Sequence, residues 1–306
     1  MPPRGVSYPM ANFIHLSDLH FGSHLPELVD AVVDRCAIEQ PDLVIISGDF
    51  TQRARTGEFA EAGRFLDRLK ADGHAILAVP GNHDIPLYDV LRRFLSPLTR
   101  YKKFIGDELC PFHEVKGVSV LGINTARSAT FKDGSISHEQ IDFITETFAR
   151  TDPANVRVLV THHPLFALPV GDGELGAPVD HQADALAAIA EAGVDLLLAG
   201  HNHRASNEAS ELTKGAGRAL VIQAGTATST RVREERQSFN HLLVEPDGVT
   251  VSVETWCGDA FQRGIGVRFE RDHDQWRAAD GARVEKPAQS ADAPAPHVLR
   301  VLGSAA

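Results

Sequence analysis

The feature that most constrains the fold of this chain is a series of short apolar runs separated by segments with the periodicity of amphipathic helices. Strands that are apolar on both faces and alternate with helices are typical of a mainly parallel sheet that is covered on both sides. The pattern therefore predicts an α/β fold. The predicted strands are residues 12–16, 42–47, 75–80, 118–123, 157–161 and 194–198, and the predicted helices are residues 25–39, 56–70, 137–149 and 181–192.

In the last third of the chain, the alternation of strands with helices gives way to short strands, which are predicted at 219–224, 239–244 and 249–255. The last two are joined by Pro246-Asp247-Gly248, a typical hairpin turn. Glycine and charged residues interrupt the pattern from 259 to 272, where no strand is predicted, and the final residues are rich in Ala, Pro, Asp and Ser. We therefore expect a leader at 1–11, one domain at 12–276 and a poorly ordered tail at 277–306.

Composition narrows the class of protein. A chain of 306 residues with 43% hydrophobic residues can bury a large core, and it has no apolar run long enough to cross a bilayer. The three cysteines lie far apart and outside any CxxC pair, which argues against a disulfide framework. Without a signal sequence at the amino terminus, these features predict a cytoplasmic location and no membrane partner. The net charge of −11 disfavours nucleic acid as a partner, and self-association into a homo-oligomer stays open.

Side chains that can bind metal follow five of the predicted strands. Because the carboxyl ends of parallel strands meet at one edge of a sheet, these side chains can converge although they lie far apart in sequence. Two of the motifs also space their ligands by two, which in extended backbone points both side chains to the same side. The residues are Asp18 with His20, Asp49, Asn82 with His83, His162, and His201 with His203.

Each motif alone has a plain structural interpretation. Gly81-Asn82 and Gly48-Asp49 are ordinary turn sequences, and a single buried histidine is commonly a satisfied core residue. Five such motifs at the same end of successive strands favour a metal centre instead. Carboxylate, imidazole and amide oxygen without thiolate suit Mn, Fe, Zn or Co. Seven ligands are too many for one small cation, so they indicate two cations with a bridging carboxylate.

In this order, Asp18-x-His20, Gly48-Asp49, Gly81-Asn82-His83-Asp84, His162 and Gly200-His201-x-His203 resemble the motifs of the calcineurin-like metallophosphoesterases. The chain further resembles the class III cyclic nucleotide phosphodiesterase branch in His162-His163-Pro164 and in the segment from Asp133 to Gln140. The resemblance extends from about residue 12 to residue 256. It implies an α/β fold of four layers, in which a central β-sandwich of two sheets is flanked by helices.

The resemblance also implies how the ligands divide. Asp18, His20, Asp49 and His203 would surround one metal, and Asp49, Asn82, His162 and His201 the other, with Asp49 bridging. His162 is taken as the ligand, and His163 is expected to point elsewhere. A hydroxide that bridges the two metals would attack the phosphate. His83 would then protonate the leaving alkoxide or hydrogen-bond the phosphoryl oxygen, and Asp84 would orient His83.

The resemblance thus implies a small-molecule phosphate ester as the substrate. These expectations favour a dinuclear-metal phosphodiesterase, with 3′,5′-cyclic nucleotides as the leading substrate class. A phosphomonoesterase or a nucleotide pyrophosphohydrolase could use the same centre, and segments 87–111, 127–133 and 165–179 are the candidates for discriminating among them. A non-catalytic interaction module is an alternative of another class, but such chains should have lost ligands, and here every motif position is filled. A nuclease is disfavoured by the acidic charge.

Overall fold

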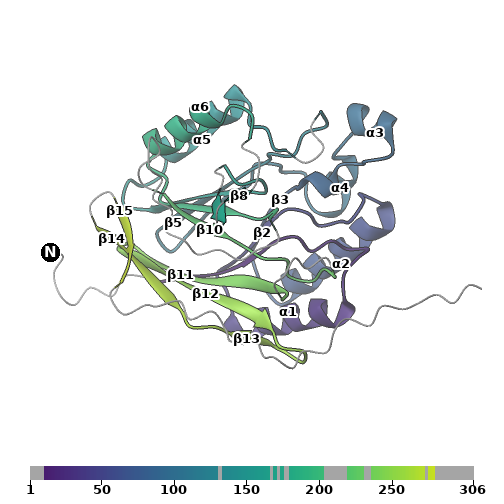
Figure 1. Ribbon diagram of the computed structural model, residues 1–306, viewed down its shortest axis with the longest axis horizontal. Helices are drawn as coiled ribbons and strands as arrows, with labels where there is room; N and C mark the ends of the chain where they lie inside the picture. The colour runs from purple at the N-terminus through teal and green to yellow at the C-terminus, as the bar shows by residue number, and fades with distance from the viewer. Residues whose placement is uncertain are drawn as a thin grey trace, which may run out of the picture.

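The computed structural model describes residues 10–129, 133–165, 168–170, 173–175, 179–202, 219–230, 236–272 and 275–279. Within them, two mixed β-sheets pack face to face, with helices on the outer faces (Figure 1). The first sheet has the order β15-β14-β12-β11-β1-β2-β3, with β13 paired to β12, and the second has the order β10-β9-β6-β5-β4.

The elements have the following bounds. The first sheet contains β1 (Ala11–Leu16), β2 (Leu43–Ser47), β3 (Ile76–Val79), β11 (Ser238–Glu245), β12 (Gly248–Trp256), β13 (Phe261–Arg263), β14 (Val267–Asp272) and β15 (Gln275–Ala278). The second contains β4 (Phe112–Val115), β5 (Val118–Ile123), β6 (Val156–Thr161), β9 (Leu196–Ala199) and β10 (Leu220–Gln223), and β7 (Leu168–Val170) pairs with β8 (Gly173–Leu175). The helices are α1 (Pro26–Glu39), α2 (Thr56–Ala71), α3 (Val90–Leu95), α4 (Thr99–Phe104), α5 (His138–Ala149) and α6 (Gln182–Glu191), and Asn82–Asp84 forms a 3-10 turn, η1.

Three separate apolar cores hold the layers together. One lies between the two sheets and includes Phe13, Val158 and Leu198. The other two lie outside them, where α1 and α2 cover the first sheet and α5 and α6 the second. The expected four-layer sandwich is thereby confirmed. The residue pattern alone predicted one parallel sheet covered by helices, and this was wrong. A strand packed between a helix layer and a second sheet needs apolar residues on both faces, and so does a strand packed between two helix layers, so the pattern does not distinguish them.

Local sequence signals set several element boundaries. Helix α5 begins after Ser137 in the expected capping box, because the Ser137 hydroxyl accepts from the Gln140 backbone N–H at 3.3 Å and the Gln140 side chain accepts from the Ser137 N–H at 3.1 Å. The hairpin between β11 and β12 turns at Pro246-Asp247, with Glu245 opposite Gly248.

Segment 259–272 differs from the expectation, since it contains β13 and β14. Val267 and Phe269 alternate with charged residues and are each only 2% exposed, so β14 buries a single face against the sandwich. Arg268 and Glu270 belong to its outer face, whereas Arg271 pairs with the buried Asp195 at 2.6 Å. Helices long and apolar enough to cross a membrane are lacking in the described part of the chain. Residues 1–9 and 280–306 lie outside the described residues.

Candidate metal centre

The candidate ligands come from both sheets of the sandwich. Strands β1, β2 and β3 run parallel in one sheet, and β6 and β9 run parallel in the other. The side chains that follow these five strands meet where the edges of the two sheets come together. They are Asp18, Asp49, Asn82, His162 and His201. The sequence pattern predicted a site at the edge of one sheet.

The backbone at this edge is not extended. Asp18, His20, Asp49 and His201 have φ of 53°, 48°, 53° and 71°, which is left-handed and uncommon for residues other than glycine. The expectation that Asp18 and His20 share a side through extended spacing is therefore wrong. Two consecutive sharp turns aim these side chains inward, and such strain is typical of functional sites.

Glycines allow the loops to approach one another. A Cβ on Gly48 would lie 2.6 Å from His162 Nδ1, and the φ of Gly48 is +93°. A Cβ on Gly81 would lie 2.2 Å from Asp49 Oδ1. Both distances are far below van der Waals contact. The glycines of Gly48-Asp49 and Gly81-Asn82 thus serve a packing requirement of the site as well as a turn.

One group of ligand atoms surrounds His20. Its Nε2 lies 3.6 Å from Asp18 Oδ1 and 3.8 Å from Asp49 Oδ2, and all three residues are buried. The Nδ1 of His20 lies 3.4 Å from the carbonyl oxygen of Thr51. Asp18 Oδ2 is fixed by the Ser17 hydroxyl at 2.7 Å and by the His201 backbone N–H at 3.0 Å.

A second group surrounds His162 and shares Asp49 with the first. His162 Nε2 lies 3.5 Å from Asp49 Oδ2, 3.1 Å from Asn82 Oδ1 and 3.3 Å from His201 Nδ1. His201 Nδ1 lies 3.2 Å from the same Asn82 oxygen. Asp49 is therefore the carboxylate common to both groups, which is the arrangement that two neighbouring cations with one bridging ligand require.

The geometry of these atoms fits cations. His162 Nδ1 lies 2.8 Å from the carbonyl oxygen of Ser47, which can only accept, so Nδ1 carries the hydrogen. In the neutral ring Nε2 then has only a lone pair, yet it faces the oxygens of Asp49 and Asn82. A positive centre is needed among them. Metal–ligand bonds of about 2.0–2.2 Å place neighbouring ligand atoms about 3.0–3.5 Å apart, close to the separations found here.

Electrostatics shows the same need for positive charge. Burial opposes charge on His162, but the Asp49 carboxylate outweighs it and raises the pKa of His162 to about 9. Burial also disfavours ionised Asp49, yet His162 and His83 hold its pKa well below the usual range. In the metal-free protein a proton thus occupies this position, and metal binding would displace it.

His83 points past the ligands. Its backbone N–H donates to Asp49 Oδ1 at 2.8 Å, and its Nδ1–H donates to the Gln52 carbonyl at 2.8 Å. Its ring packs edge-on against His20 with centroids 4.9 Å apart. In this tautomer of the neutral ring, Nε2 carries the lone pair. Segment 47–52, which carries Asp49, therefore provides the carbonyls that fix three imidazoles: His20, His83 and His162.

Asp84 differs from the expectation that it orients His83. Its carboxylate accepts from the backbone N–H groups of Phe50 (3.2 Å), Thr51 (2.9 Å) and Gly81 (2.9 Å) and from the Thr51 hydroxyl (3.0 Å). Burial, followed by the nearby Asp49 charge, raises the pKa of Asp84 to about 7. Asp84 therefore ties the loop after β3 to the loop after β2, and Gln52 takes the role expected of Asp84.

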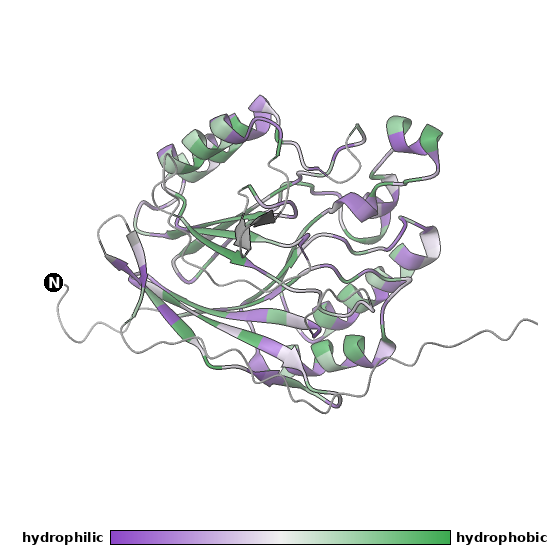
Figure 2. Ribbon diagram, viewed as in Figure 1, coloured by the Kyte–Doolittle hydropathy of each residue, from purple (hydrophilic) through white to green (hydrophobic). Residues whose placement is uncertain are grey.

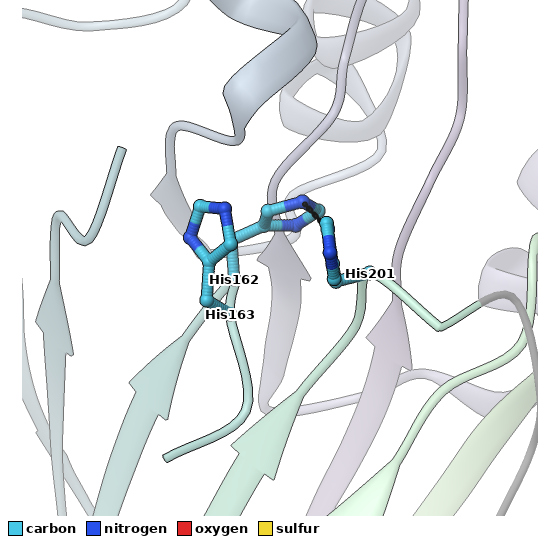
Figure 3. Close-up of side chains that lie close together, drawn as sticks. All are labelled: His162, His163 and His201. Carbon is cyan, nitrogen blue, oxygen red and sulfur yellow. Dashed lines mark hydrogen bonds between the residues drawn. The ribbon is translucent and has the colours of Figure 1, made fainter. Parts of the chain in front are cut away.

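His163 also differs, because it lies at the site. Ring nitrogens of His162, His163 and His201 fall within 4.8 Å of one another, and Figure 3 shows the three rings gathered at the ends of β6 and β9. His163 Nδ1 bonds the Thr125 hydroxyl at 2.8 Å. His203 lies outside the described residues.

Several supporting residues were missed from the sequence. Ser17, Ser47 and Gln52 act through a hydroxyl or a backbone carbonyl, which no side-chain motif reveals. Thr125 had a detectable signal, since it closely follows the predicted strand at 118–123, as the ligands follow theirs. Beside His83 lies an open pocket of about 450 Å³ lined by Gly22, Ser23, Gln52, Arg53, Arg55 and Glu58.

Comparison with known proteins identifies the family. Residues 11–205 match the family model described as calcineurin-like phosphoesterase, so the chain belongs to this family. The DNA double-strand break repair protein Mre11 of Saccharolobus solfataricus is 30% identical over 129 residues, which are 37% of this chain and 33% of that protein. This chain therefore matches only about a third of the length of that relative.

Solved structures share the fold. PhoD superposes with a TM-score of 0.67 and 12% identity over 93% of this chain and 74% of that chain. The purple acid phosphatase PPD1 from yellow lupin (Lupinus luteus) seeds gives a TM-score of 0.62 and 13% identity over 87% of this chain and 55% of that chain.

Proposed function

We propose that this protein is a dinuclear-metal phosphodiesterase, with 3′,5′-cyclic nucleotides as the leading substrate class. The observation that supports it most is the pair of ligand groups that share Asp49, with imidazole nitrogens facing carboxylate and amide oxygens at 3.1–3.8 Å. Asp18, His20 and Asp49, completed by His203, would hold one cation. Asp49, Asn82, His162 and His201 would hold the other, and the donor set suits Mn, Fe, Zn or Co.

When bound, the cations supply positive charge for the phosphoryl oxygens and a hydroxide nucleophile near neutral pH. The residues prepare this centre in advance. Ser17 and the His201 N–H hold Asp18, and the carbonyls of segment 47–52 hold the imidazoles, so little rearrangement is needed as charge develops. Asp84 keeps that segment in place through its backbone contacts.

His83 serves the leaving group. Because its Nδ1–H is committed to the Gln52 carbonyl, the exchangeable proton is the one on Nε2, and His83 can act as an acid only as an imidazolium. A neutral His83 presents a lone pair at Nε2 and cannot donate. This predicts that poor leaving groups, which need the proton most, depend on the protonated ring.

The substitution His83→Ala tests this role. It should lower kcat on diesters with poor leaving groups by about 100-fold or more, because general acid catalysis is typically worth 100-fold to 10,000-fold. Diesters with excellent leaving groups should be affected much less. Metal content per chain must stay at the wild-type level. An equal loss on both kinds of substrate would count against the acid role of His83.

The wider function is tested by measuring bound metal and then hydrolysis under Mn. The panel is a chromogenic diester, its monoester, cyclic AMP, cyclic GMP and a dinucleotide pyrophosphate. DNA is added because the matched relative is a DNA repair protein. Preferred hydrolysis of the chromogenic diester or the cyclic nucleotides supports the proposal, whereas preferred hydrolysis of DNA, the monoester or the pyrophosphate would replace it. Fewer than two metals per chain together with no hydrolysis would refute an enzymatic function.

A further inference from the structure

Helix α3 buries an arginine and exposes its apolar residues. Arg93 is only 3% exposed, and its guanidinium donates to the carbonyls of Ser128 at 2.7 Å and Pro86 at 3.1 Å. The apolar side chains of α3 are 59–75% exposed: Val90, Leu91, Phe94 and Leu95. A helix of a globular protein normally shows the opposite arrangement. Polar contacts of Arg93 thus help hold α3 to the protein while its apolar side is left facing outward.

The exposed apolar surface extends to the residues before α3. We call the α3 face the set Leu87, Tyr88, Val90, Leu91, Phe94 and Leu95. Among the described residues, these are six of the eleven large hydrophobic side chains that are exposed. In Figure 2, α3 carries green turns at a projecting corner of the molecule. A concentration of exposed apolar side chains of this kind marks an interaction site.

Basic residues border the α3 face. The Arg53 guanidinium lies 5.9 Å from the centroid of the Tyr88 ring. Arg100 donates to the Ala54 carbonyl at 2.7 Å, and its pKa is lowered first by burial and then by the charge of Arg92. Residues 87–103 contain five basic residues and one acidic residue, although the whole chain has a net charge of −11. Because Arg93 is buried and Arg92 lies 3.5 Å from Asp89, the excess positive charge of this segment comes from Arg100, Lys102 and Lys103 on α4.

We propose that the α3 face docks on an anionic lipid surface. Exposed leucine and aromatic side chains can enter the boundary between headgroups and acyl chains, and neighbouring basic residues are attracted to anionic headgroups. A second copy of the chain fits less well. A two-fold interface centred on this face would gather the basic residues that border it, Arg53 among them, from both copies around one apolar contact, and like charges oppose that arrangement.

The α3 face is continuous with the candidate metal centre. Gln52, whose carbonyl fixes His83, is followed by Arg53, which packs against Tyr88. Docking would thus hold the candidate metal centre close to the lipid surface. This proposal departs from the sequence-based expectation of no membrane partner, since it adds surface contact without a helix that spans the bilayer.

Flotation of the full chain with vesicles tests this proposal without any need for hydrolysis, so its failure is distinct from failure of the proposed function. Vesicles of phosphatidylcholine alone are compared with vesicles that also contain phosphatidylglycerol. The anionic vesicles should bind at least about tenfold more protein, and added salt should reduce binding. The double substitution Leu91→Ser and Phe94→Ser should lower binding by at least about tenfold.

The matched control is Ile38→Ser with Ile265→Ser, since both isoleucines are 69% exposed and lie elsewhere on the protein. The control should bind as the wild type does. Absence of binding to anionic vesicles, or an equal loss in the control, would overturn the proposal. A concentration-dependent dimer that only the Leu91→Ser, Phe94→Ser variant loses would assign the face to self-association instead. A fall of Tm by more than about 5 °C in that variant would show that the face packs within the chain.

Discussion

The buried imidazole of His15 makes the stability of this protein depend on pH. His15 is 0% exposed on β1, and its Nε2 lies 2.9 Å from the Ser47 hydroxyl. Burial lowers the pKa of His15 from 6.5 to about 3, against a smaller opposing effect of Asp18. The unfolded chain takes up a proton as the pH falls through about 6.5, but the folded chain does so only near 3. The unfolded state therefore binds more protons between these values, and stability falls as the pH falls.

The magnitude follows from the size of the pKa difference. Each pKa unit corresponds to about 1.36 kcal/mol, so the full effect of His15 is about 5 kcal/mol, lost progressively below about pH 6.5. At about pH 5, one and a half units below the unfolded value, the loss relative to about pH 7.5 is about 2 kcal/mol.

Urea unfolding of the wild type and of His15→Gln at the two pH values measures this loss. Glutamine offers an amide to Ser47 but does not titrate. The gap in unfolding free energy between wild type and variant should therefore change by about 2 kcal/mol between about pH 7.5 and pH 5, in favour of the variant at the lower pH. The substitution His138→Gln is the control, because the His138 side chain is 68% exposed. A gap that stays constant within about 0.5 kcal/mol would refute the reasoning.

Two matched pairs of substitutions test the packing of Gly48 against the site and the cap of α5. Gly48→Ala and Gly73→Ala impose nearly the same backbone strain, with φ of +93° and +88°, but only the Cβ at position 48 meets the His162 ring. Gly73→Ala should cost about 1–2 kcal/mol of stability, and Gly48→Ala should cost more because its Cβ must also displace the buried His162 ring. Only Gly48→Ala should lower the metal content; equal metal content in both would contradict the packing argument. Ser137→Ala removes the acceptor for the Gln140 N–H and should cost about 1 kcal/mol in urea unfolding, whereas Ser137→Asp should retain most of the stability.

Much of the fold could be read from the sequence because its signals are local. The periods of apolar residues predicted α1, α2, α5 and the central strands, and Ser137 with Gln140 marked the beginning of α5. Strand β14 was not predicted, because its alternation of Val267 and Phe269 with charged residues spans only one short strand, which lies between β12 and β15. The division of strands between two sheets is a matter of which faces meet, and both arrangements demand the same apolar pattern.

The candidate site also combines features that the sequence predicts with features that it does not. Asp18, Asp49, Asn82, His162 and His201 were predicted from their positions after strands, and the structure brings them together. The supporting contacts were not predictable, since the carbonyls of segment 47–52 exist in every sequence and gain their role only from the rings placed against them. For the same reason, the expectations that Asp84 orients His83 and that His163 points away from the site were wrong.

The sequence by itself determined which chemical groups are present, in what order, and that they end strands, because hydrophobic period and residue type are properties of the chain. Only the tertiary structure decided how these groups are arranged. The left-handed turns at Asp18 and Asp49 lie in neighbouring loops that bond to each other, and the close approach of Gly48 to His162 depends on two sheets meeting at one edge. Those contacts join residues far apart in the chain, so no local pattern could specify their geometry.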